Sequence, residues 1–221
     1  MSIRYSVYSF LSWLFAKELS QEDIAGMRVR VEALQSLPTA LNATNKPLSE
    51  GITLLSRAVI AMEDKDQERV RLELATEYAG LFLGVRQRPP HPSESVYRST
   101  RHDIMQKERD QVMSAYREMG FEKVKDFKEP EDHIALELDF MAALSKKAQD
   151  LLGSDNTAEV ERYIRKQKAF LDEHLALWID DLVKDIESSA RIDFYLGAGF
   201  ITQGFVKIDR TLLTQILEKL K

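Results

Sequence analysis

The sequence predicts an all-α protein, a compact bundle of about nine helices, and three observations support this. Apolar residues recur with the 3.6-residue period of a helix, whereas the alternation typical of strands never persists for more than a few residues. Nine glycines and six prolines are few in a chain of 221 residues, and their positions mark turns and helix ends. Hydrophobic residues make up 44% of the chain and charged residues 30%, which is typical of a globular domain rather than a disordered chain.

Four helices are predicted before the first proline-rich segment. The first covers residues 3–18, and the next three begin after residues whose side chains favour a helix N-terminus, namely Ser20, Ser49 and Asp64. Gly84 ends the fourth helix, because glycine readily adopts the left-handed conformation that closes helices. The first half of the chain is therefore predicted to be helical almost throughout.

A loop over residues 85–93 follows, because three prolines in four positions exclude a helix there. Five further helices are predicted after it: 102–119, 130–153, 157–187 with a bend near residues 174–176, 190–205 and 210–220. Gly197 and Gly199 lie within an apolar helical stretch, so we expect them to permit close helix packing rather than phosphate binding. We expect one domain over residues 1–221, with subdomains 1–120 and 130–221 on either side of a hinge near residues 121–129.

The composition excludes several classes of function. The chain has no cysteine, which excludes disulfides, thiol nucleophiles and cysteine-held zinc or iron–sulfur clusters. Its net charge of −5 argues against wrapping nucleic acid, which requires a basic surface. The N-terminal apolar stretch is interleaved with polar residues and lacks a cleavage site, so we interpret it as an amphipathic helix. We expect a cytoplasmic protein without a transmembrane segment.

The acidic residues are concentrated in one segment. Residues 1–120 carry sixteen basic and sixteen acidic side chains, whereas residues 129–139 alone carry five acidic and no basic ones. His133 and Glu137 are four residues apart, so on a helix they would share a face and could ligate a divalent metal. Spacing alone leaves two other interpretations open: a binding surface or, favoured on spacing, acidic residues that stabilise a helix N-terminus while His133 faces solvent.

Two other segments could carry function. Leu81 and Phe82 lie just before the rigid proline loop and could form the wall of a peptide groove, although a tight connection between helices is an equal alternative. His102 and Asp103 form an HD dipeptide on a predicted helix, a pattern that is common by chance. No nucleophile elbow, Walker-type loop or dinucleotide-binding glycine motif is present.

In combination, these segments resemble the TorD/DmsD/NarJ family of redox-enzyme maturation chaperones. The matching residues are Glu77-Tyr78, Leu81-Phe82, Gly84, Pro92, Glu94-Ser95-Val96-Tyr97, Tyr116, Gly120, Glu129-Pro130, Asp132-His133 and Glu137-Leu138 with Phe140-Met141. Weaker agreement follows at His174-Leu175, Trp178 and Phe194-Tyr195. The resemblance is strong over about residues 74–145, and its most specific part is the stretch from Glu129 to Met141.

The resemblance implies a non-enzymatic chaperone with no cofactor of its own. Relatives bind the twin-arginine leader peptide and the apo-subunit of a molybdopterin-containing oxidoreductase, assist cofactor insertion, and delay export through the Tat pathway. Contacts with the Tat or molybdenum-cofactor machinery would fit this role, and either a monomer or a domain-swapped dimer is compatible with it. No nucleic acid is expected as a partner.

The same resemblance assigns the leader-binding residues. They are Asp132, His133, Leu81, Phe82, Pro92, Ser95 and Tyr97, to which the acidic segment adds Glu129 and Glu137. We expect Asp132 to pair with a leader arginine, His133 to orient it or bond the peptide backbone, and the apolar residues to receive apolar side chains. The loop over residues 85–92 departs from many relatives because it carries Arg86 and Arg88.

Two alternatives from other classes remain. One is an HD-like divalent-metal phosphohydrolase, whose metal would be held by His91, His102, Asp103 and Asp132. The other is a helical adaptor unrelated to export. A stoichiometric divalent ion would favour the hydrolase, and co-purification of a molybdoenzyme subunit would favour the chaperone.

Overall fold

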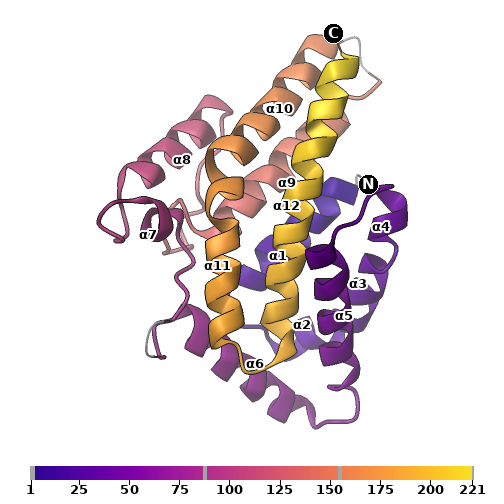
Figure 1. The fold of residues 1–221 in the computed structure, drawn as a ribbon, viewed down its shortest axis with the longest axis vertical. Helices are drawn as coiled ribbons and strands as arrows, with labels where there is room; N and C mark the ends of the chain where they lie inside the picture. The colour runs from indigo at the N-terminus through magenta and orange to yellow at the C-terminus, as the bar shows by residue number, and fades with distance from the viewer. Residues whose placement is uncertain (1–2, 87–88, 154–155, 221) are drawn as a thin grey trace. The chain divides into compact units, whose positions relative to one another are not determined.

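The computed structural model describes residues 3–86, 89–153 and 156–220, and within these ranges the chain is helical with no strand beyond a single bridge (Figure 1). The α-helices are α1 Ile3–Ala16, α2 Gln21–Ala25, α3 Met27–Leu34, α4 Leu37–Ala40, α5 Lys46–Ile60, α6 Gln67–Phe82, α7 Glu94–Arg98, α8 Lys107–Glu118, α9 Ile134–Asp150, α10 Thr157–Phe170, α11 Ala176–Ser189 and α12 Asp193–Lys219. A π-helical segment, Leu171–Leu175, joins α10 to α11. The all-α prediction is confirmed, although the described helices are more numerous than the nine or so predicted. Arg88 lies outside the described residues.

The chain divides into two compact units. Unit 1 comprises Met1–Ala16, Pro92–Trp178 and Val206–Lys221, and unit 2 comprises Lys17–His91 and Ile179–Phe205. Helices α11 and α12 contribute residues to both units. The connector over residues 121–129 lies within unit 1, and its role as a hinge stays a prediction. None of the described helices is both long and apolar enough to cross a membrane.

The core of unit 1 is built around α9, which packs against α1 and α10. Three buried aromatic rings meet there: the Phe140 ring lies 4.6 Å from that of Tyr116 and 4.9 Å from that of Phe170, centroid to centroid. A buried carboxylate fastens the two chain ends of this unit, because Asp209 pairs with the Arg4 guanidinium (Nη2–Oδ2 2.9 Å) and accepts the Tyr8 hydroxyl (2.7 Å). These contacts hold α1 against α12.

In unit 2, α5 packs against α12 at backbone distance. A Cβ on Gly51 would lie 2.6 Å from the Ile201 nitrogen, and one on Gly197 would lie 2.7 Å from the Leu55 nitrogen, so neither helix tolerates a side chain at this crossing. The predicted packing role of Gly197 is therefore confirmed. At Gly199 a Cβ would meet side chains only at ordinary contact distances, from 3.5 Å outward, so its absence is not required for this contact.

Several helix starts differ from those predicted. Ser20 and Asp23 do form a capping box, but Asn45 rather than Ser49 caps α5, its Oδ1 accepting from the Leu48 N–H (2.9 Å). Asp66 rather than Asp64 caps α6 in the same way. The capping residue lies three positions before the amide that it satisfies, and Ser49 itself lies within the first turn of α5.

The prediction was also wrong at three later boundaries. Helix α8 begins at Lys107 rather than at residue 102, because His102 and Met105 adopt positive φ angles of 50° and 59° in the preceding turn. Helix α9 begins four residues later than Pro130, since His133 is its N-cap. The predicted helices 190–205 and 210–220 are one helix, α12, because Asp209 is a buried ion-pair partner rather than a cap.

Candidate functional site

The segment before α7 pairs with the segment before α9 in unit 1. The Glu94 N–H donates to the Asp132 carbonyl (2.9 Å), and the Ile134 N–H donates to the Pro92 carbonyl (2.7 Å). These bonds flank an antiparallel bridge between Ser93 and His133. The sequence stretch around Ser-Val-Tyr and the acidic stretch around Asp-His, forty residues apart, are thereby joined through their backbones.

His133 is a buried helix cap. Its Nδ1 accepts a hydrogen bond from the Ala135 N–H (3.1 Å), and its ring meets the Phe127 ring edge-on at 5.3 Å. Only 2% of the residue is exposed. The interpretation that His133 faces solvent is therefore wrong: the imidazole satisfies one of the amide groups that a helix N-terminus leaves without a partner.

Asp132 is buried beside it and holds the start of α7. Its Oδ2 accepts from both the backbone N–H (2.8 Å) and the hydroxyl of Ser95, while its Oδ1 has no hydrogen-bond partner. Burial raises the pKa of the Asp132 carboxyl, and the two bonds from Ser95 oppose that rise without cancelling it. In this conformation the carboxylate fixes a turn and has no access to solvent.

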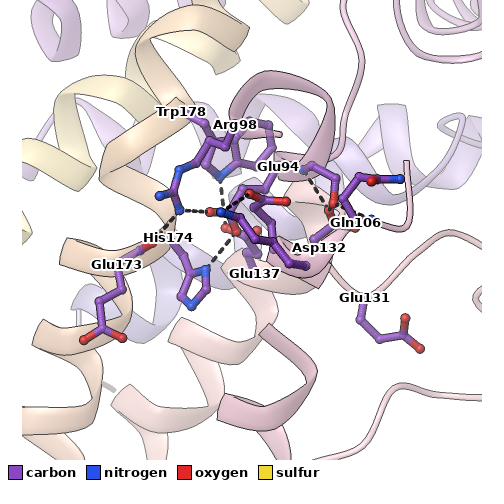
Figure 2. Close-up of polar contacts among 12 residues, drawn as sticks. Glu94, Arg98, Gln106, Glu131, Asp132, Glu137, Glu173, His174 and Trp178 are labelled. Carbon is purple, nitrogen blue, oxygen red and sulfur yellow. Dashed lines mark hydrogen bonds and ion pairs between the residues drawn. The ribbon is translucent and has the colours of Figure 1, made fainter. Parts of the chain in front are cut away.

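A second layer of buried polar groups adjoins this pair (Figure 2). The Glu94 carboxylate bonds His174 through Oε2 (Nδ1, 2.8 Å) and Arg98 through Oε1 (Nη1, 2.6 Å). The Trp178 indole N–H donates to Glu137 Oε2 (3.2 Å), and Glu137 Oε1 has no hydrogen-bond partner. All three acidic side chains of this network, Glu94, Asp132 and Glu137, are fully buried.

Glu137 is the most perturbed group of this network. Burial raises its pKa well above the ordinary value of a glutamate, and the nearby carboxylates of Glu94 and Asp132 push it in the same direction. The single donor, Trp178, lowers it only in part. Folding therefore shifts the Glu137 carboxyl toward its neutral form relative to the unfolded chain, because protonation reduces the repulsion among three buried acids.

An open cleft of about 540 Å³ lies against this network in unit 1. Its wall includes both partners of Glu94, together with three acidic side chains and one exposed leucine: Arg98, His174, Glu118, Asp172, Glu173 and Leu177. Asp172 is paired with Lys168 and Arg210, and Glu118 with Lys166. The Glu173 carboxylate has no recorded partner among the described residues, and Figure 2 shows it directed away from the buried network.

The structure brings most of the predicted site residues together. Pro92, Ser95, Asp132, His133 and Glu137 are buried at the paired segments, and the Tyr97 ring stacks on that of Trp178 at 5.6 Å. Glu129 is exposed and stands outside the network. The predicted set thus consists mainly of buried side chains rather than of exposed ones.

The two predicted apolar residues belong to the other compact unit. Leu81 and Phe82 belong to unit 2, where both are buried and the Phe82 ring contacts those of Tyr78 (5.2 Å) and Tyr195 (5.7 Å). In this conformation both are core residues of unit 2, and their role in peptide binding stays a prediction.

Four residues of the network were not predicted as site residues from the sequence: Glu94, Arg98, His174 and Trp178. Three of them lie in stretches that matched the family, so a local signal existed, but nothing in their spacing predicted that Glu94 and His174 meet across eighty residues.

The residues of the hydrolase alternative adopt other roles. His102 lies in a turn rather than on a helix, with its Nδ1 3.0 Å from the Val96 carbonyl, and Asp103 accepts the Ile104 N–H. Asp132 is engaged with Ser95, and His91 belongs to unit 2. Over residues 3–86, 89–153 and 156–220, no three His, Asp or Glu side chains are grouped as a metal site.

Comparisons with known proteins agree on one family. The profile of the nitrate reductase delta subunit family matches residues 34–184. The chaperone protein TorD of Vibrio cholerae serotype O1 is 27% identical over 217 residues, covering 98% of this chain and 94% of the relative. TorD of Photobacterium profundum is 28% identical over 210 residues, covering 95% and 94% of the two chains.

A solved structure agrees on the fold. The crystal structure assigned to a redox enzyme maturation protein from Archaeoglobus fulgidus superposes with a TM-score of 0.50, at 16% identity, over 97% of this chain and 95% of that one. The resemblance drawn from the sequence motifs is thus confirmed by a family profile and by full-length relatives. The chain belongs to the nitrate reductase delta subunit family, that of the TorD/NarJ-type redox-enzyme maturation chaperones.

Proposed function

We propose that this chain is a cytoplasmic chaperone dedicated to one molybdopterin-containing oxidoreductase, whose twin-arginine leader and apo-subunit it binds until the cofactor has been inserted. Membership of the family and near full-length similarity to TorD chaperones support the chaperone role. The observation that carries leader binding is the cleft of unit 1 beside the Glu94–His174 pair. Lys166 and Arg98 also line its wall, but the Glu173 carboxylate has no recorded partner in the described part of the chain. In this role the chain holds its client and delays export without catalysing a reaction.

The chemistry of the cleft matches that of a leader peptide. Such a peptide presents two adjacent guanidinium groups followed by an apolar segment, and guanidinium groups bind carboxylates through paired hydrogen bonds. Glu173 offers an uncompensated carboxylate at the cleft, and Leu177, which is 47% exposed, offers an apolar contact beside it. An arginine pair at this position would also displace little existing structure, since Glu173 has no partner to lose.

The buried residues act in this proposal as positioning groups. Asp132 and His133 fix the paired segments before α7 and α9, and Ser95 is held by Asp132. Arg98 and His174 then connect this framework to the cleft wall through Glu94. Substituting Asp132 or His133 would weaken leader binding by loosening the wall rather than by removing a contact atom.

The first test is calorimetric titration of the purified protein with synthetic twin-arginine leader peptides from molybdoenzymes of the same organism. Glu173→Gln should weaken binding about two- to five-fold, as expected for one partly exposed ion pair, and a leader with two lysines should bind more weakly than the arginine leader. Glu32→Gln, an exposed substitution in unit 2, serves as the matched control.

Asp132→Asn and His133→Gln test the positioning role in the same titration. Weaker leader binding by folded variants supports it, and unchanged binding contradicts it. If no arginine leader binds the wild-type protein, and no molybdoenzyme subunit co-purifies with it, the proposal fails as a whole.

A further inference from the structure

A basic cleft in unit 2 has no role in leader binding. It has a volume of about 440 Å³ and lies between α6 and the turn that joins α11 to α12. Four cationic side chains line it together with two apolar ones: Lys65, Arg69, Arg86, Arg191, Leu72 and Ile192. All of them belong to the same unit, so the cleft is formed within one compact body.

The charges of this cleft do not cancel. Two acidic side chains also line it, and each is already paired: Glu73 with Lys65 (3.0 Å) and Glu77 with Arg86. No hydrogen bond or ion pair of the Arg69 or Arg191 guanidinium is recorded among the described residues, and both residues are exposed. Two uncompensated guanidinium groups therefore line one cavity.

The wall that carries these charges is held in place by a buried carboxylate. Glu77 pairs with Arg86 through Oε2 and accepts the backbone N–H of Arg191 through Oε1 (2.7 Å). Arg86 in turn donates to the Ser189 carbonyl (2.6 Å) at the end of α11. The turn bearing Arg191 is thus tied to α6, which bears Arg69, and such preorganisation lowers the entropic cost of binding a ligand.

We propose that this cleft binds a small phosphorylated molecule. The excess of two positive charges complements a phosphate monoester, which carries about −1.5 to −2 charges at neutral pH. Guanidinium groups bind phosphate oxygens in bidentate fashion, so Arg69 and Arg191 supply the contacts to the phosphate. Leu72, which is 51% exposed, and Ile192 provide an apolar surface for the remainder of the ligand.

The size of the cavity suits a small molecule. Its volume lies within the range of about 300–1,000 Å³ that is typical of small-molecule sites. A second cleft of about 350 Å³ shares Lys65, Glu73, Arg191 and Ile192 with it and extends the space toward Met62. The proposal concerns unit 2 and does not depend on leader binding in unit 1.

The test uses the full-length protein and two defined probes, pyrophosphate and phenyl phosphate, titrated by calorimetry at low salt. Both should bind saturably, and the double variant Arg69→Gln/Arg191→Gln should weaken binding by about tenfold or more. Arg71→Gln is the matched control, because Arg71 lies on the same helix but is paired with Glu68 and does not line the cleft. It should bind both probes like the wild type.

Three outcomes would overturn the proposal: no saturable binding by the wild-type protein, equal binding by the double variant, or an equal loss in Arg71→Gln. A fourth would also do so, namely a polyglutamate peptide that binds more tightly than either phosphate and loses its binding in the double variant. Because neither guanidinium has a recorded partner, the double variant should unfold at the wild-type temperature, which a thermal melt checks.

Discussion

Each unit contains a buried glutamate, and the two differ in their hydrogen-bond partners and in the charges beside them. In unit 2 both oxygens of Glu77 are satisfied, one by the Arg86 guanidinium and one by the Arg191 N–H. In unit 1 Glu137 accepts one bond from Trp178 while its other oxygen has no hydrogen-bond partner. Glu77 has a cation beside it, whereas Glu137 has two further carboxylates.

We interpret Glu77 as a charge that joins structural elements, and Glu137 as an acid that belongs to the network beside the proposed leader cleft. A buried ion pair with all its bonds made fastens elements together, here the α11–α12 turn to α6. A buried acid with incomplete partners lowers stability, and such groups concentrate where a protein binds or reacts. The cleft proposed for the leader lies beside the second kind.

The largest effect should follow from breaking the ion pair of unit 2. Arg86→Met leaves the Glu77 carboxylate buried without its cation, and removal of one partner from a buried pair costs about 3–5 kcal/mol. We expect the lower end, about 3 kcal/mol, because the Arg86 side chain is 15% exposed and the Arg191 N–H remains. Chemical denaturation at neutral pH measures the change.

Arg71→Met is the matched control for that prediction, since the Arg71 and Glu68 side chains of its pair are 32% and 48% exposed. It should change the free energy of unfolding by about 0.5 kcal/mol or less. Similar losses in the two variants would mean that the Glu77–Arg86 pair is no more than another surface contact, and the contrast between the two glutamates would fail.

A smaller effect is expected where unit 2 packs helix on helix. Gly197→Ala places a Cβ 2.7 Å from the Leu55 nitrogen and 2.9 Å from the Gly51 carbonyl oxygen, so α5 and α12 must separate. Overpacking of this kind costs about 1–3 kcal/mol, and we expect about 2 kcal/mol because backbone atoms cannot rotate away. The same denaturation measurement reports it.

Gly199→Ala, two residues along the same helix, should act in the opposite direction. Its Cβ would meet only side chains, at 3.5 Å and beyond, so the gain in helix propensity of about 0.5–1 kcal/mol should dominate. A loss at position 199 equal to that at 197 would show that α12 is intolerant of substitution generally, rather than packed on α5 at one point.

The sequence predicted most accurately those features that depend only on residues close together along the chain. The period of apolar residues is a local signal, and it located most of the long helices. Helix starts were less secure: the sequence analysis placed the caps at Ser49 and Asp64, whereas Asn45 and Asp66 cap α5 and α6, and which nearby polar residue caps a helix depends on local geometry. Helix α7, five residues long, left no periodic signal at all.

The sequence singled out residues that the structure brings together, but it did not predict how they are organised. The motif containing Asp132 and His133 was found because its order along the chain is specific. Their burial was not predicted, because exposure depends on what packs against a residue from distant parts of the chain: Glu94 and Asp132 meet through a bridge, and Trp178 reaches Glu137 across 41 residues. When these long-range contacts are not known, a segment rich in acidic residues is interpreted as exposed to solvent.

The prediction that tests the comparison most directly concerns Glu137. Its raised pKa means that the folded protein holds a proton that the unfolded chain releases above about pH 4.5. The contribution of this group to stability is therefore complete below that pH and is lost as the pH rises toward its folded-state pKa. Glu137→Gln keeps an oxygen to accept from Trp178 but cannot ionise, so it should be more stable than the wild type at about pH 8 and nearly equal to it at about pH 4.

Urea denaturation across that pH range measures the difference, and Glu129→Gln, an exposed substitution in the same acidic segment, should leave the pH dependence unchanged. Reduced stability of Glu137→Gln at every pH would mean that the ionised carboxylate is required by the fold. Glu137 would then resemble Glu77, a charge kept for structure, and the acidity of unit 1 would need another explanation than the site beside it.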